Sequence, residues 1–142
     1  MTITYFGYGS LVNVATLSEE TTVSPGRLSG WVREWRIRGA NPQGRGVCSL
    51  SVAPEDGVSI RGVAASEPRG GLDKLNRREW KYDRVDGVGA SFQCDAEGAP
   101  GADAMFLYRS KPEHYGWGCA ENPILQSYVD CVLSGFHAFW GE

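Results

Sequence analysis

The chain opens with a short apolar segment that runs into the sequence YFGYGSL, residues 5–11. β-branched and aromatic residues at positions 2–8 predict a strand, and two glycines separated by one tyrosine end it. Because glycine relaxes the limits on backbone conformation, a tight turn is expected here, with successive N–H groups left exposed. Such a turn is either a plain connection or a concave set of donors for a carboxylate or an oxyanion, and these residues alone fit both.

Two well-known phosphate-binding loops do not fit this turn. The dinucleotide-binding fingerprint GxGxxG needs a glycine at position 12, where Val12 stands. The P-loop needs the sequence GK[ST], which the chain does not contain. Ser10 adds a hydroxyl to the turn, and it can cap a helix that begins near Leu11.

The overall composition is that of an ordinary folded domain. No apolar run in the 142 residues approaches the roughly 18 residues that a membrane-spanning helix needs. The net charge is −3 with acids and bases mixed, so no basic stripe predicts binding to nucleic acid or to an anionic membrane. The first residues lack the basic and apolar segments of a secretory signal, which predicts a cytoplasmic protein.

Cysteine and histidine are too few and too scattered to predict a metal site or a catalytic triad. The four cysteines form no CxxC or CxxH pair, and only two histidines are present. Zinc sites normally show such paired spacing. The pattern therefore predicts free thiols in a reducing compartment and no metal.

The hydrophobic pattern predicts one domain over residues 1–142, mostly strands with two or three helices. Glycine-rich and polar turns separate the segments. The predicted strands cover residues 2–8, 28–38, 47–52, 58–65, 82–88, 90–94 and 104–108, with a turn at 53–57. The clearest helix is predicted between Asn122 as its cap and Gly135 at its exit, with Pro123 in its first turn. Its continuous apolar stripe, which includes Tyr128, predicts packing on a sheet.

A shorter helix, predicted over residues 72–80, carries an informative carboxylate. Leu72, Leu75 and Glu79 are spaced by three and then four residues, so they share one helical face. A carboxylate on an apolar face loses hydration, which predicts a raised pKa suited to general acid–base catalysis. The alternative is a rotated helix on which Glu79 pairs with an arginine at the surface. No second carboxylate is placed beside Glu79 to suggest a glycosidase.

Taken together, these motifs resemble the γ-glutamylcyclotransferase-like family, particularly its glutathione-degrading, ChaC-type branch. YGSL (residues 8–11) follows the first strand, where that family carries its substrate loop, and LNRREWKYDRV (75–85) is similar to the block with its acid/base glutamate. Three further blocks are also similar: GWVREWRIRG, FLYRSKPEHYGWG and ILQSYVDCVLSG. All five blocks occur along the chain in the same order as in the family. The chain departs from the family's pattern at Trp80 and Lys81, and its connecting loops are shorter than those usual in the glutathione-specific branch.

The resemblance implies an α+β fold, a small mixed β-barrel flanked by helices, and a reaction that needs no cofactor. The α-amine of a small-molecule γ-glutamyl substrate attacks its own γ-amide carbonyl, which releases 5-oxoproline and an amine or a peptide. Glutathione is one candidate substrate. Glu79 is the implied general base and then acid. The implied substrate-binding residues are Tyr8, Gly9, Ser10, Leu11, Tyr82 and Tyr108.

Two other functions stay open at this level. One is a non-catalytic small-molecule-binding domain on the same fold, and the other is a related cyclotransferase that acts on γ-glutamyl amines. They differ in whether a product is released and in the leaving group. Selectivity for the leaving group is expected to depend on the loops at residues 39–46 and 95–103.

Overall fold

In the computed structural model the described residues are 2–13, 15, 17, 19–40, 44–79, 82–95 and 105–141. The predicted loop at 95–103 lies almost wholly outside them, as do positions 80 and 81. The elements follow in the order β1 (Thr2–Gly7), η1 (Ser10–Val12), β2 (Thr22–Ala40), β3 (Gly46–Pro68), η3 (Arg69–Gly71), α1 (Leu72–Arg78), β4 (Tyr82–Asp86), η4 (Gly89–Ser91), β5 (Phe92–Cys94), β6 (Phe106–Ser110), η5 (Pro112–His114) and α2 (Gln126–Trp140), where η marks a short 3-10 helix.

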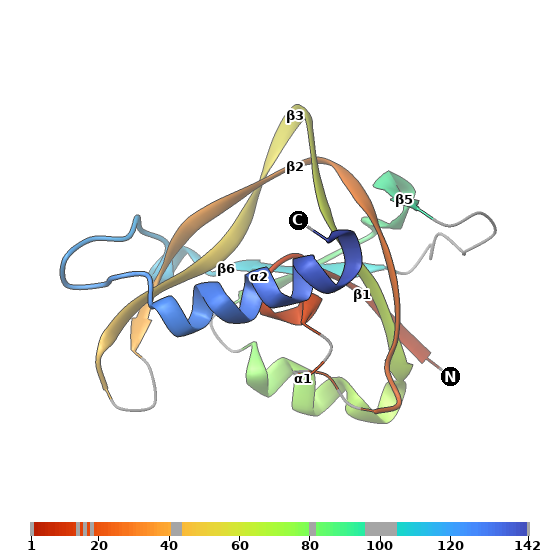
Figure 1. Cartoon of the computed structure of the whole chain (residues 1–142), viewed down its shortest axis with the longest axis horizontal. Coiled ribbons are helices and arrows are strands. Elements are labelled where there is room, and N and C mark those ends of the chain that lie inside the picture. The colour runs from red at the N-terminus through yellow and green to blue at the C-terminus, as the bar shows by residue number, and fades with distance from the viewer. Residues whose placement is uncertain are drawn as a thin grey trace.

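The six strands form one mixed sheet in the order β4-β6-β1-β3-β2-β5. β1 pairs antiparallel with β3 and parallel with β6, and the other pairs are antiparallel. The two longest strands, β2 and β3, rise together into a tall arch at the top of Figure 1. The predicted α+β class is therefore confirmed, and the predicted barrel takes the form of a bent, open sheet with β4 and β5 at its edges.

β3 runs through the region where two strands and a turn were predicted. Its register with β2 jumps from Ser29↔Ser59 to Trp31↔Pro54, so residues 55–58 fall outside the pairing. Gly57 has a φ of +80° at this break, a conformation that L-residues with a side chain rarely adopt. The predicted turn is thus an interruption of register within one long strand, at the top of the arch (Figure 1).

The end of β1 is packed on both sides. Phe6 and Tyr8 belong to the apolar cluster that also contains Val132 of α2. Tyr5 and Leu11 belong to a second cluster, together with Leu75 of α1. Successive side chains of a strand point to opposite faces, so β1 joins the two clusters and α1 and α2 cover different parts of the core. The chain that leaves β1 is therefore held between them.

The shorter helix forms where the sequence predicts it. α1 begins at Leu72, Leu75 is buried inside it, and Glu79 is its C-terminal cap residue. The apolar spacing of this segment therefore predicted the helix and its buried face correctly. No helix of the described residues is long and apolar enough to cross a membrane.

The longer helix is displaced along the sequence from its prediction. α2 begins at Gln126 and ends at Trp140, and its C-terminal cap residue, Gly141, has a φ of +76°. Asn122 does not cap it, because its side-chain amide donates to the carbonyl oxygens of Gly39 and Val47, at 3.3 Å each. Gly135 is not the exit either. It lies buried inside the helix, where an added Cβ would come within 2.6 Å of the backbone nitrogen of Asn13.

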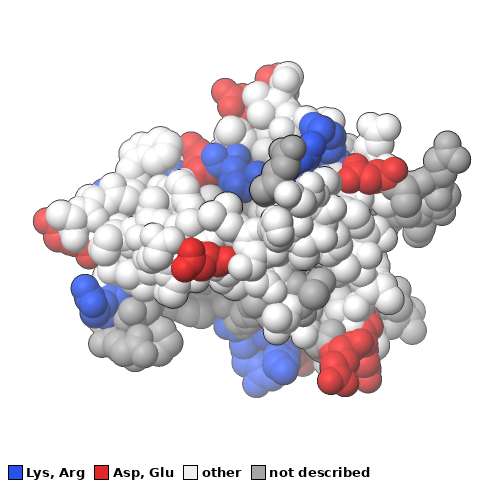
Figure 2. Space-filling view, viewed as in Figure 1, with Lys and Arg blue, Asp and Glu red and all other residues white. Residues whose placement is uncertain are grey.

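Charge is mixed on the face of the molecule drawn in Figure 2. Lys and Arg side chains of the described residues alternate there with Asp and Glu side chains rather than gathering in one stripe. This distribution agrees with the interspersed charges of the sequence.

Candidate functional site

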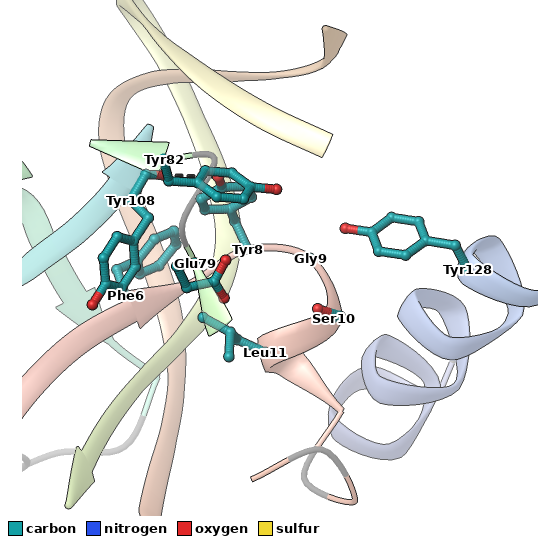
Figure 3. A pocket seen from close by; sticks show the side chains of 9 residues that line it. All are labelled: Phe6, Tyr8, Gly9, Ser10, Leu11, Glu79, Tyr82, Tyr108 and Tyr128. Atoms are coloured by element: carbon teal, nitrogen blue, oxygen red, sulfur yellow. Dashed lines mark hydrogen bonds between the residues drawn. The ribbon is translucent and has the colours of Figure 1, made fainter. Parts of the chain in front are cut away.

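A pocket opens beyond the end of β1, between the following loop, the end of α1 and one side of α2 (Figure 3). Its empty volume is about 300 Å³. This volume includes the open space at the mouth of the pocket. Its lining residues are Phe6, Tyr8, Gly9, Ser10, Leu11, Glu79, Tyr82, Tyr108 and Tyr128. All of the site residues predicted from the sequence are in this set.

The loop at residues 8–11, called the pocket loop below, turns directly into η1. The N–H groups of Val12 and Asn13 donate to the carbonyl oxygens of Gly9 and Ser10, each at 3.0 Å. The earlier N–H groups of a helical turn have no acceptor within the turn itself. Gly9, not Ser10, is the N-terminal cap residue of η1, and no side-chain hydrogen bond caps it. The prediction that Ser10 caps a helix here is wrong, because Ser10 is already the first residue of the turn.

The two glycines around Tyr8 serve different purposes. An added Cβ on Gly7 would lie 2.8 Å from the Cβ of Leu11, so Gly7 lets the chain fold back tightly on itself. An added Cβ on Gly9 would lie 3.1 Å from the hydroxyl oxygen of Tyr128, across the pocket. Gly7 therefore permits the turn, and Gly9 keeps the space between the turn and α2 open.

Glu79 reaches the pocket from the end of α1. Its backbone N–H donates to the carbonyl oxygen of Leu75, and its own carbonyl accepts from the N–H of Tyr82, both at 3.0 Å. These bonds fix the backbone on both sides of a half-buried residue. Its carboxylate points into the pocket in Figure 3, toward the side of the pocket loop. It is the only carboxyl group among the described residues that line the pocket.

Three tyrosines line the pocket with hydroxyl groups that are held by hydrogen bonds. The hydroxyl of Tyr8 donates to the carbonyl of Tyr108 at 2.7 Å, which appears as a dashed line in Figure 3. Tyr82 donates to the carbonyl of Leu50 at 2.9 Å, and Tyr108 donates to the side-chain oxygen of Asn76 at 2.7 Å. Because each hydroxyl has a fixed acceptor, these rings are held in place as parts of the pocket surface.

Burial and the Glu79 carboxylate together keep three tyrosines of the pocket neutral, namely Tyr8, Tyr108 and Tyr128. Burial is the larger cause that raises the pKa of Tyr8 well above its usual value, and the negative charge of Glu79 adds to it. The same two causes raise the pKa of Tyr108, and they raise the pKa of Tyr128 to about 12. Near neutral pH these three phenols are protonated donors, so none of them is suited to act as a general base.

Phe6 and Tyr128 line the pocket but were not predicted as site residues. Phe6 lies two positions before Tyr8, and this spacing places both side chains on the same side of an extended chain. Tyr128 belongs to the apolar stripe of the predicted C-terminal helix, and it is the residue of that stripe with a polar end. In Figure 3 its hydroxyl points from α2 toward the pocket, opposite Glu79. The strand alternation and the apolar helical stripe were thus the sequence signals that could have identified Phe6 and Tyr128 as pocket residues.

The described residues contain no group of three or more His, Cys, Asp or Glu side chains placed to hold a metal ion. The four cysteines are free thiols. The site is thus described by one carboxylate, one glycine-containing loop and a set of aromatic rings.

No family model and no curated protein sequence matches the chain, whereas solved structures do. A γ-glutamyl cyclotransferase superposes with a TM-score of 0.73 at 14% identity, over 97% of this chain and 80% of that one. A yeast γ-glutamyl cyclotransferase specific to glutathione gives 0.72 at 13% identity, over 98% and 88%. An uncharacterised human protein gives 0.68 at 13% identity, over 96% and 79%. The chain therefore has the fold of the γ-glutamyl cyclotransferases, which confirms the predicted resemblance at the level of structure.

Proposed function

We propose that this protein is a γ-glutamyl cyclotransferase that releases 5-oxoproline from a small γ-glutamyl amide or peptide. The observation that carries the proposal is that Glu79 and the pocket loop, which are far apart in the sequence, line one pocket. The fold shared with cyclotransferases, one of them specific to glutathione, supports the same reaction.

The proposed reaction needs one group that first accepts and then donates a proton. Glu79 takes a proton from the substrate's α-amine as its nitrogen attacks the γ-carbonyl carbon, and a new C–N bond closes a five-membered ring. The bond from that carbon to the γ-amide nitrogen then breaks, and Glu79 returns the proton to the leaving nitrogen. A single carboxyl group can perform both transfers in turn. Glu79 is the candidate because it is the only carboxyl group among the described residues that line the pocket, whereas burial raises the pKa values of Tyr8 and Tyr128.

The pocket loop supplies the other requirement, which is the binding of negative charge. The carbonyl oxygen of the substrate becomes an oxyanion during the attack, and backbone N–H groups stabilise such a charge when they are already in place. In this proposal the backbone of Gly9, Ser10 and Leu11 binds the glutamyl head group. The rings of Tyr8, Tyr82 and Tyr108 hold the glutamyl chain in its folded-back conformation, which intramolecular attack requires.

The test is a panel of γ-glutamyl amines, dipeptides and glutathione, each scored for release of 5-oxoproline. We expect the wild type to turn over at least one class, and Glu79→Gln to lower the rate by about 10²–10⁴-fold, the usual contribution of general acid–base catalysis. Asp73→Asn is the matched control, since Asp73 is an exposed carboxylate on the same helix.

Two results would contradict the proposal. Near wild-type turnover by Glu79→Gln, with an unchanged far-UV spectrum, would remove Glu79 from the mechanism. Calorimetric binding of γ-glutamyl compounds by the wild type, with no product over hours, would instead identify a non-catalytic binding domain. Comparison of the substrate panel also distinguishes glutathione from γ-glutamyl amines as the preferred class.

A further inference from the structure

A half-buried arginine lies behind the pocket loop without lining the pocket. Arg33, on β2, donates from its Nε to the carbonyl oxygen of Tyr8 at 2.8 Å. Its Nη2 donates to the carbonyl oxygen of Arg61 on β3. Its guanidinium carbon lies 4.9 Å from the centre of the Phe136 ring on α2. One side chain therefore contacts the pocket loop, the sheet and α2.

Arg33 is a charged group that binds backbone rather than a carboxylate. In the described part of the chain its hydrogen-bond partners are the two carbonyl oxygens, and no carboxylate is in salt-bridge contact with it. Burial lowers the pKa of Arg33 to about 10, which still leaves it positively charged near neutral pH. Keeping a cation away from water is costly, and charge-assisted hydrogen bonds offset that cost. Its two bonds thus fix backbone groups with more strength than neutral bonds would.

The bond to Tyr8 also determines where the next N–H group points. The carbonyl of Tyr8 and the N–H of Gly9 belong to one planar peptide unit, and in the trans form they point in opposite directions. A carbonyl held toward Arg33 therefore directs the Gly9 N–H away from Arg33. Gly9 lines the pocket and Arg33 does not. Withdrawal of electron density by the cation also strengthens the N–H as a donor, because linked hydrogen bonds polarise one another.

We propose that Arg33 is a positioning residue that fixes the Tyr8–Gly9 peptide, so that the Gly9 N–H donates into the pocket. Its effect on turnover rests on the proposed cyclotransferase function, whereas its effect on the Gly9 amide does not. Arg33 acts through that peptide and makes no contact with substrate.

Two variants of Arg33 and one control separate this role from general stability. Arg33→Met removes the guanidinium but keeps an apolar stem against Phe136. Arg33→Lys keeps the charge, but a single ammonium replaces the planar fork that serves both carbonyls. Arg27→Met is the control, because Arg27 is an exposed arginine of the same strand.

The first measurement is the ¹H–¹⁵N resonance of the Gly9 amide in glycine-labelled protein. We expect it to move markedly in Arg33→Met, to move less in Arg33→Lys, and to stay in place in Arg27→Met. An unmoved Gly9 resonance in a folded Arg33→Met variant overturns the proposal, whether or not the protein is an enzyme. If Arg33→Met does not fold, the same comparison is made with Arg33→Lys, and an unmoved resonance there overturns it.

The second measurement is kcat/KM for 5-oxoproline release. We expect the kcat/KM of Arg33→Met to fall at least about tenfold. This loss should be smaller than the roughly 10²–10³-fold loss that follows removal of a whole oxyanion donor. Arg33→Lys should recover part of the loss. If the Gly9 resonance moves in Arg33→Met but the variant keeps full activity, only the proposed effect of Arg33 on turnover is refuted. A moved resonance in a protein whose wild type releases no 5-oxoproline refutes the proposed function and leaves the positioning role supported.

Discussion

The two walls of the pocket are built differently. One wall is the pocket loop with the end of α1, and it contributes backbone groups and the Glu79 carboxylate. The other wall is α2, and it contributes the ring and hydroxyl of Tyr128. The first wall has the groups that can move a proton and bind an oxyanion, whereas the second has a neutral phenol. In the proposed reaction the first wall therefore performs the chemistry, and the second wall bounds the pocket on the opposite side.

The two walls approach each other closely just after η1, and this contact does not depend on a ligand. An added Cβ on Gly135 of α2 would lie 2.6 Å from the nitrogen and 2.8 Å from the Cα of Asn13, just after η1. The side-chain amide of Asn13 donates to the carbonyl oxygen of Cys131 on the same helix, at 3.0 Å. The distance between the walls is therefore set by a helix packed against backbone, with a glycine at the point of contact.

The largest effect on this arrangement is expected from Gly135→Ala. The new methyl group meets backbone atoms, which cannot rotate away, so α2 must move away from η1. Overpacking of this kind costs about 1–3 kcal/mol, partly offset by the gain of about 1 kcal/mol in helix propensity from glycine to alanine. We expect a lower melting temperature and a loss of 5-oxoproline release.

Gly70→Ala is the matched control for that experiment, since an added Cβ there meets no atom within 4 Å. If Gly135→Ala melts at the wild-type temperature or above and keeps full activity, the two walls are not coupled through this contact. The role of α2 in setting the distance between the walls would then have to be abandoned.

The first wall is also the part of the site that could be predicted from the sequence. The pocket loop is a run of neighbouring residues, and Glu79 lies one helical turn after the buried Leu75. Both signals are local, because they depend on strand ends, glycine and helical spacing. Local patterns of this kind follow from backbone geometry and predict well.

The second wall could not be predicted in the same way, because its signals are tertiary. Asn122 and Gly135 have the residue types of a helix start and a helix end. The side chain of Asn122 instead donates to the carbonyl oxygens of Gly39 and Val47. Gly135 is instead the point where the helix packs against Asn13. Residue type alone does not distinguish an asparagine that caps a helix from one that makes a tertiary hydrogen bond. It also does not distinguish a glycine that ends a helix from one that allows close packing within it.

A smaller effect is expected from Gly9→Ala, which places a methyl group between the walls. The nearest atom to the new Cβ is the hydroxyl oxygen of Tyr128 at 3.1 Å, followed by the Cδ1 of Leu50 at 3.5 Å. In the proposed reaction the methyl group occupies space that the glutamyl head group needs, so we expect KM for γ-glutamyl substrates to rise more than kcat falls. Steady-state kinetics across the substrate panel measures the split. An unchanged KM would mean that the head group binds elsewhere.

The smallest effect is expected from Tyr128→Phe, which removes one oxygen atom from the second wall. The pKa of Tyr128 is about 12, so its hydroxyl is a neutral donor near neutral pH. Its loss therefore removes no acid or base, and we expect kcat/KM to fall only several-fold.

The Tyr128→Phe change also removes the atom that an alanine at position 9 would crowd. We therefore expect the double variant Gly9→Ala, Tyr128→Phe to bind substrate better than Gly9→Ala alone, and a double-mutant cycle gives the coupling. Simple additivity would show that the walls do not meet at this point. A loss in Tyr128→Phe as large as that in Glu79→Gln would place chemistry on α2 as well, because a group that only shapes the pocket cannot cost as much as the group that transfers the proton.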